Sequence, residues 1–289
     1  MKKFTAIILS AAAVLSLASC GGNTVTENKT EDTLTVYTSF YAMADFAKEV
    51  GGDKVNVEIL CPVGSEPHDF EPTASDMAKL TKADVFIYNG MDMEHWAESV
   101  AENLGNVTVV IASEGIEPGT VEYDPHIWLN PDKAHMEMEN IAKGYIAADA
   151  ENESYYREQL AACKEKTDAL KAEMEDAAAG FKKKNIVTSH EAYSNLADAL
   201  GIVALGVNNL DNSEDPTPTT MAKLEAFIKN NDIKYVFTEP LSSSAVMDTI
   251  AADTGCEVLT LDPFEGNAEG KGYFDVMYAN LEALKTALN

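Results

Sequence analysis

From residue 34 onward, short runs of β-branched and apolar residues alternate with longer runs whose apolar positions recur every three or four residues. The short runs predict strands, and the longer runs predict amphipathic helices. This alternation predicts parallel sheets, because parallel strands need long crossover connections between them. The predicted strands are Leu34–Thr38, Val55–Leu60, Val85–Tyr88, Val107–Ile111, Asn185–Thr188, Ile202–Gly206, Tyr235–Thr238 and Val258–Leu261.

The helices expected around these strands fall into two groups on either side of one long helix. Residues Asn152–Gly180 have no strand character and carry apolar residues at spacings of three and four. They predict one amphipathic helix of roughly 40 Å. The other predicted helices are Ala42–Val50, Ala74–Leu80, Met93–Asn103, Pro131–Ala148, Ala192–Leu200, Thr219–Asn230, Ser244–Thr254 and Tyr273–Leu288. We therefore predict an α/β protein with two lobes, each a four-stranded parallel sheet flanked by helices, joined by one long rigid helix.

The beginning of the chain has the pattern of an export signal. Lys2 and Lys3 precede an apolar run that ends at Leu17-Ala18-Ser19-Cys20, which is typical of a bacterial lipobox; the alternative is an ordinary cleavage site with an incidental cysteine. Lipidation of Cys20 would hold the exported chain to the cell membrane. The expected divisions are a signal peptide over 1–19, a flexible tether over 20–33, a first lobe over 34–149, a linking helix over 150–182 and a second lobe over 183–289.

The charge of the chain narrows the classes of partner, and its cysteines narrow the kinds of cross-link and metal site. The chain of 289 residues has 21 basic and 48 acidic residues, a formal net charge of −27. Nucleic acid is therefore not an expected partner, because phosphate binding needs a basic surface. After Cys20 the remaining cysteines are Cys61, Cys163 and Cys256. Their odd number and lack of CxxC spacing do not indicate a disulfide framework or a zinc knuckle.

Three of the five histidines follow predicted strands. His68 lies in the proline-rich segment CPVGSEPHDFEPT, His126 lies in YDPHIWLNP, and His190 ends a strand in VTSHEAY. The carboxyl ends of parallel strands meet at one edge of a sheet, where α/β proteins bind their ligands. We therefore expect these side chains to converge. Three imidazoles and one carboxylate form a tetrahedral set that suits Zn²⁺ and is acceptable to Mn²⁺.

The expected fourth ligand is Asp262, which follows the last strand in TLDPFEG, and the alternative carboxylate is Glu239 in VFTEPLSS. His95 and His135 lie on predicted helices among charged residues, so we expect both to be solvated. Three carboxylates beside the histidines are candidates to orient the imidazoles, or else are solvated loop residues: Asp69, Glu71 and Asp124.

Five segments resemble the zinc and manganese receptors of bacterial ABC importers, known as cluster A-I or cluster 9 solute-binding proteins. They are PHDFEPT (67–73), NGMDMEHW (89–96), DPHIWLNP (124–131), TSHEAY (188–193) and the pattern Tyr273…Met277…Asn280…Leu284. The resemblance begins near Leu34 and implies two α/β lobes joined by a rigid helix. It also implies metal ligands at His68, His126, His190 and Asp262. Many manganese receptors have a glutamate in place of the third histidine, so the resemblance favours zinc.

One segment departs from that family. Many zinc receptors have a long histidine-rich acidic loop before the second ligand, whereas SEGIEPGTVEY (113–123) is short and has no histidine. This difference leaves room for manganese.

The resemblance implies an extracytoplasmic metal receptor that delivers its ion to an ABC importer permease and is not an enzyme. The rival functions are a zinc hydrolase and a surface adhesin. A hydrolase needs a general base near a metal-bound water, and the sequence has no HExxH pair. With four protein ligands, a tetrahedral zinc would also have no vacant position. Adhesion is compatible with the sequence as an additional activity.

Overall fold

The computed structural model describes residues 33–121, 123–209, 216–266 and 270–289. The predicted signal peptide, the predicted lipidation site Cys20 and all but the last residue of the predicted tether lie outside these residues. Cys61, Cys163 and Cys256 are free thiols. Within the described part of the chain, none of the helices combines the length and the apolar character needed to cross a membrane.

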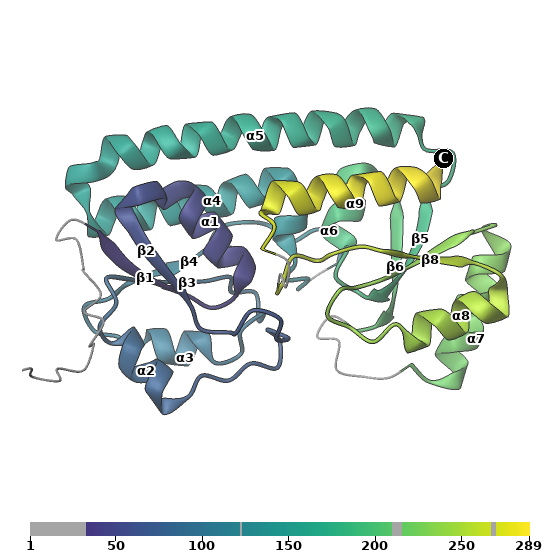
Figure 1. The fold of residues 1–289 in the computed structure, drawn as a ribbon, viewed down its shortest axis with the longest axis horizontal. Helices are drawn as coiled ribbons and strands as arrows, with labels where there is room; N and C mark the ends of the chain where they lie inside the picture. Colours follow the sequence, from purple (N-terminus) through teal and green to yellow (C-terminus); the bar gives the residue numbers. More distant parts are fainter. Residues whose placement is uncertain (1–32, 122, 210–215, 267–269) are drawn as a thin grey trace, which may run out of the picture. The chain divides into compact units, whose positions relative to one another are not determined.

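The first sheet has four parallel strands in the order β2-β1-β3-β4 (Figure 1). These are β1 (Leu34–Thr38), β2 (Val55–Ile59), β3 (Val85–Tyr88) and β4 (Thr108–Ile111). Helices α1 (Tyr41–Gly51) and α4 (Pro131–Ala148) pack on one face, and α2 (Ala74–Leu80) and α3 (Ala97–Ala101) pack on the other. Because both faces are covered, all four residues of β3 are buried, which explains their uninterrupted apolar run.

The second sheet repeats this topology with the strand order β6-β5-β7-β8. Its strands are β5 (Asn185–His190), β6 (Val203–Asn208), β7 (Tyr235–Thr238) and β8 (Glu257–Thr260). Helices α6 (Ser194–Leu200) and α9 (Tyr273–Leu288) pack on one face, and α7 (Pro218–Asn230) and α8 (Ala245–Thr254) pack on the other. Three 3₁₀ segments, η1 (Gly52–Lys54), η2 (Ile127–Leu129) and η3 (Ala150–Asn152), complete the described elements.

Helix α5 (Glu153–Gly180) connects the two sheets in the sequence and has 28 residues. It contacts α1 and α4 beside the first sheet and α6 and α9 beside the second. Its buried positions recur at spacings of three, four and seven, as one apolar stripe requires: Tyr156, Cys163, Thr167, Leu170 and Met174. One hydrophobic cluster includes residues of both sheets and of α5. The predicted fold class, with two four-stranded parallel sheets and one long helix, is confirmed.

The prediction of a helix over Met93–Asn103 was wrong over its first turn, because α3 begins only at Ala97. The carboxylate of Glu94 accepts hydrogen bonds from the backbone N–H groups of Asn89 and Gly90, at 2.9 and 3.0 Å. It also accepts the hydroxyl of Ser39 at 2.5 Å. These bonds fold residues 89–94 into a tight turn, in which Met91 and Asp92 have positive φ angles. A buried side chain therefore overrides the local helical pattern.

Candidate metal centre

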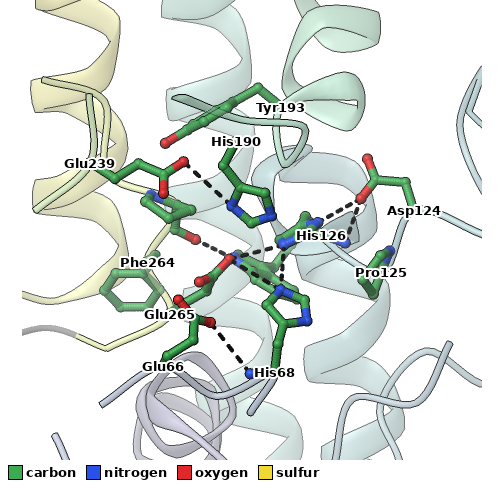
Figure 2. Close-up of polar contacts among 12 residues, drawn as sticks. Glu66, His68, Asp124, Pro125, His126, His190, Tyr193, Glu239, Phe264 and Glu265 are labelled. Atoms are coloured by element: carbon green, nitrogen blue, oxygen red, sulfur yellow. Dashed lines mark hydrogen bonds and ion pairs between the residues drawn. The ribbon is translucent and has the colours of Figure 1, made fainter. Parts of the chain in front are cut away.

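Three histidines and one glutamate converge beyond the carboxyl ends of the strands. Ligand-capable atoms of His68, His126, His190 and Glu265 all lie within 4.8 Å of one another (Figure 2). His68 follows β2, His126 immediately precedes η2, His190 ends β5, and Glu265 follows β8. All four side chains are buried, with His126 and His190 fully inaccessible to solvent. The structure thus brings together the three histidines that the sequence singled out.

Asp124 fixes the orientation of the His126 imidazole. The Asp124 Oδ1 atom accepts the backbone N–H of His126 at 3.0 Å and lies 2.7 Å from its Nδ1. The other oxygen of Asp124 accepts the hydroxyl of Ser194 and the side-chain amide of Asn195, both at the start of α6. Burial would raise the pKa of Asp124, but the hydrogen bonds from His126 and Ser194 outweigh it and keep this pKa below its ordinary value. An ionised Asp124 therefore keeps a proton on Nδ1 and leaves Nε2 to face the cluster.

The atoms that face one another in the cluster are electron-pair donors. Nε2 of His126 lies 2.9 Å from Oε1 of Glu265 and 3.2 Å from Nε2 of His68. The lone pairs of these atoms repel each other unless a proton or a metal ion lies between them. Burial opposes the charged imidazole of His126, but its hydrogen bonds with Asp124 and Glu265 outweigh burial and raise its pKa. The close approach of these donor atoms therefore favours a positive charge between them.

The carboxylate of Glu265 is suited to such a cation. Burial would raise the pKa of Glu265, but the hydrogen bond with His126 and the charges of the three imidazoles lower it well below its ordinary value. The group is therefore ionised although it is buried. Three imidazole nitrogens and one carboxylate oxygen, all within reach of one point, fit the tetrahedral coordination of Zn²⁺.

Glu239, the alternative carboxylate, lies beside His190 rather than among the four converging groups. Its Oε1 atom is 3.5 Å from Nδ1 of His190, and Figure 2 shows it on the side of the ring away from His126. The ring centroid of His190 is 5.0 Å from that of His126 and 5.6 Å from that of His68. Glu239 thus stands behind His190 much as Asp124 stands behind His126. This position suits an orienting carboxylate.

Asp262, the expected fourth ligand, is not brought into the group of four. Its Oδ1 atom accepts the backbone N–H of Phe264 at 2.8 Å. Its backbone N–H and C=O bond to the side chain of Asn280 on α9, at 2.9 and 2.8 Å. These bonds fix a turn in which Phe264 has a φ of 61°, and the turn delivers Glu265 to the cluster. Asp262, the acidic residue nearest the end of β8, thus shapes the loop. Glu265, the next acidic residue along the chain, faces the histidines.

The remaining sequence candidates lie away from the cluster. His95 is exposed as predicted, although it lies in a turn and not on a helix. His135 does lie on a helix, α4, but the prediction that it is solvated was wrong: it is buried, because α5 packs against α4 on this side. Asp69 and Glu71 are exposed, so neither is placed to orient an imidazole.

Sequence comparisons relate the whole chain to zinc uptake proteins. A family model described as the periplasmic zinc-uptake complex component A matches residues 36–287. The high-affinity zinc uptake system protein ZnuA of Bacillus subtilis is 33% identical over 314 residues, which cover 99% of this chain and 98% of that protein. The zinc-binding lipoprotein AdcA of Streptococcus pneumoniae is 31% identical over 309 residues. That match covers 99% of this chain and 61% of AdcA.

Solved structures agree with the sequence comparisons. The Zn(II)-bound ZnuA-like domain of S. pneumoniae AdcA has a TM-score of 0.79 and 31% identity, and the match covers 89% of this chain and 99% of that domain. The laminin-binding protein Lmb of Streptococcus agalactiae, described as bifunctional with adhesin and metal transporting activity, has a TM-score of 0.84 and 32% identity. It is matched over 89% of this chain and 100% of its own length. The likeness therefore extends to sequence as well as fold.

Proposed function

We propose that this chain, which belongs to the periplasmic zinc-uptake complex component A family, captures Zn²⁺ outside the cytoplasm and delivers it to an ABC importer permease. One observation carries the proposal: four buried electron-pair donors converge on a single point. In this function the metal ion is cargo, so the site must both hold it and release it. Lipidation of Cys20, which would keep the receptor at the membrane, is part of the same proposal.

The composition of the site favours Zn²⁺ over Mn²⁺. We propose His68, His126, His190 and Glu265 as the ligands, with Glu265 replacing Asp262 because only Glu265 lies among the imidazoles. Imidazole nitrogen suits zinc, whereas manganese favours sites richer in oxygen ligands. The runner-up is therefore a manganese receptor of the same family.

A receptor fits these residues better than a hydrolase. A zinc hydrolase keeps one coordination position open for water, whereas four protein groups meet at this point and fill a tetrahedral ion. The groups behind the imidazoles, Asp124 and Glu239, already contact ring nitrogens and so are not free to act as a general base. We extend only the metal-transporting role of Lmb to this chain, because the site supports that role.

We infer that release needs only a small displacement. Helix α5 packs against helices beside both sheets, and one hydrophobic cluster continues from one sheet to the other. This packing resists a wide hinge motion. His68 and Glu265 lie on loops beyond the strand ends, so a shift of either loop on docking to the permease would break the ligand set.

Native mass spectrometry tests the proposal. The mature chain, stripped of metal, is offered equimolar Zn²⁺ and Mn²⁺ in competition. We expect one tightly retained Zn²⁺ for each chain. Selective retention of Mn²⁺ would overturn the choice of ion and leave the receptor role, and a chain that retains neither ion would overturn both.

A further inference from the structure

Trp128 joins two segments that carry proposed ligands and that follow different sheets. It lies in η2, two residues after His126, and its side chain is fully buried. Its indole Nε1–H donates a hydrogen bond of 2.7 Å to the backbone carbonyl of Pro263. Pro263 lies in the loop after β8, two residues before Glu265. A side chain that follows the first sheet therefore binds the loop that carries the carboxylate ligand after the second.

Trp128 is itself held firmly in place. The hydroxyl of Tyr273, the first residue of α9, donates a hydrogen bond of 2.8 Å to the backbone carbonyl of Trp128. The indole ring packs against the rings of Phe40 and His126, at centroid distances of 5.2 and 5.3 Å. Both Trp128 and Tyr273 are inaccessible to solvent. Because its backbone is bonded and its ring is packed, Trp128 is a rigid anchor for the carbonyl of Pro263.

The loop also packs against its surroundings through Phe264, which directly precedes Glu265 (Figure 2). The ring of Phe264 makes edge-to-face contacts with Tyr41 on α1 and with Tyr273, at centroid distances of 5.3 and 5.7 Å. The positive φ of Phe264 is unfavourable for an aromatic residue and persists only where the surrounding contacts enforce it. The position of Glu265 thus depends on contacts outside its own loop, among them the bond from Trp128.

We propose that Trp128 is a positioning residue of the zinc site, whose indole N–H keeps the loop that carries Glu265 close enough to His126 for both to bind one ion. The proposal rests on the function proposed above. Ligands that are already in place bind an ion more tightly than ligands that must first be ordered. If the loop is in place for only a fraction of the time, the apparent affinity falls by that fraction. Breaking this one bond would also free Glu265 without moving the two sheets apart.

The test is Trp128→Phe, which keeps an aromatic ring and removes the N–H. The affinity of the full mature chain for Zn²⁺ is measured by competition with a chelator. We expect the affinity to fall by about tenfold, because a buried carbonyl loses this donor and the loop loses its anchor.

Cobalt supplies a readout that a general loss of stability would not change. Co²⁺ absorbs visible light strongly in a four-coordinate site, and the absorption weakens when water adds to the ion. We expect a weaker cobalt absorption in Trp128→Phe, because Glu265 leaves the ion for part of the time. Tyr273→Phe, which removes only the hydroxyl that holds the carbonyl of Trp128, should change the affinity and the spectrum in the same direction by a smaller factor.

Trp96→Phe is the matched control for the substitution. Trp96 is the other tryptophan of the chain, and its buried indole N–H has no hydrogen-bond partner among the described residues. Tyr145→Phe is the control for the loss of a buried hydrogen bond, since the Tyr145 hydroxyl on α4 donates to the carbonyl of Ala47 on α1 at 3.0 Å. We expect both control variants to bind Zn²⁺ and Co²⁺ as the unmodified chain does.

An unchanged affinity and cobalt spectrum in a folded Trp128→Phe chain would overturn the proposal. An equal loss of affinity in either control would also overturn it, because that result indicates a general effect of a weakened core. If Trp128→Phe does not fold, Tyr273→Phe decides the question by the same two measurements. If the unmodified chain binds no zinc, the proposed function fails, and this inference fails with it.

Discussion

Replacing His126 with alanine is expected to weaken Zn²⁺ binding by about a thousandfold, which corresponds to the loss of one of four ligands from a site worth roughly 10–16 kcal/mol. His126 contacts two of the other three proposed ligands. It lies 2.9 Å from Glu265, 3.2 Å from His68 and 2.7 Å from Asp124. Its removal takes away one donor and also the contact that sets the positions of two others.

The affinity is measured by competition with a chromogenic chelator at fixed pH. His95→Ala is the control, because His95 is the exposed histidine nearest the site and is no ligand in this account. We expect His95→Ala to bind zinc as the unmodified chain does. Equal affinities for His126→Ala and the unmodified chain would contradict the proposed ligand set, provided that the thermal unfolding of the metal-free variant shows it to be folded.

Replacing Glu137 with methionine is expected to raise the free energy of unfolding by about 2–4 kcal/mol at pH 7.5. Glu137 lies on α4 and is fully buried. Neither of its carboxyl oxygens has a hydrogen-bond partner among the described residues. Burial, followed by the charge of Glu94, raises its pKa well above the ordinary value. Methionine has a similar size and suits both a helix and an apolar environment.

The pH dependence of this effect has a definite sign. The folded chain holds the proton of Glu137 more tightly than the unfolded chain, in which the group titrates near its ordinary pKa of about 4.3. Its contribution to stability is therefore fully present below that value and is lost as the pH rises toward the folded-state pKa. The advantage of Glu137→Met should accordingly grow from pH 5 to pH 7.5.

Urea denaturation at these two pH values measures the change. Glu139→Met is the matched control, because Glu139 lies two residues away on α4 with a side chain that is 44% exposed. We expect this control to change the free energy of unfolding by no more than about 0.5 kcal/mol. A Glu137→Met chain that is less stable than the unmodified chain, or whose advantage does not depend on pH, would show that Glu137 is a paired, ionised group.

Strand β3 could be predicted closely because it is a short apolar run covered on both sides. Val85–Tyr88 was located to the residue, since all of its side chains are buried. The turn before α3 could not be predicted in the same way. There the backbone conformation is set by hydrogen bonds to the carboxylate of Glu94. One of the donors to this carboxylate is Ser39, which lies 55 positions away in the sequence. A local pattern contains no information about such a bond.

The convergence of the three histidines could be predicted because the rule about strand ends applies directly to them. His190 is the last residue of β5, and His68 and His126 lie in the loops that follow β2 and β4. The convergence of Glu265 with them was not predicted, because a turn separates it from β8 and the positive φ of Phe264 in that turn has no clear signal in the sequence. The only available hint was a second acidic residue three positions after Asp262. Likewise, the burial of His135 depends on α5, which packs over it from a later part of the chain.

The most direct test of the proposed zinc site is X-ray anomalous scattering on either side of the zinc absorption edge, from crystals of the mature chain with one equivalent of Zn²⁺. We predict a single anomalous peak about 2.0–2.2 Å from one nitrogen of each of the three imidazoles and from a carboxylate oxygen of Glu265. A peak bound by Asp262 in place of Glu265, or a peak away from His68, His126 and His190, would contradict this site.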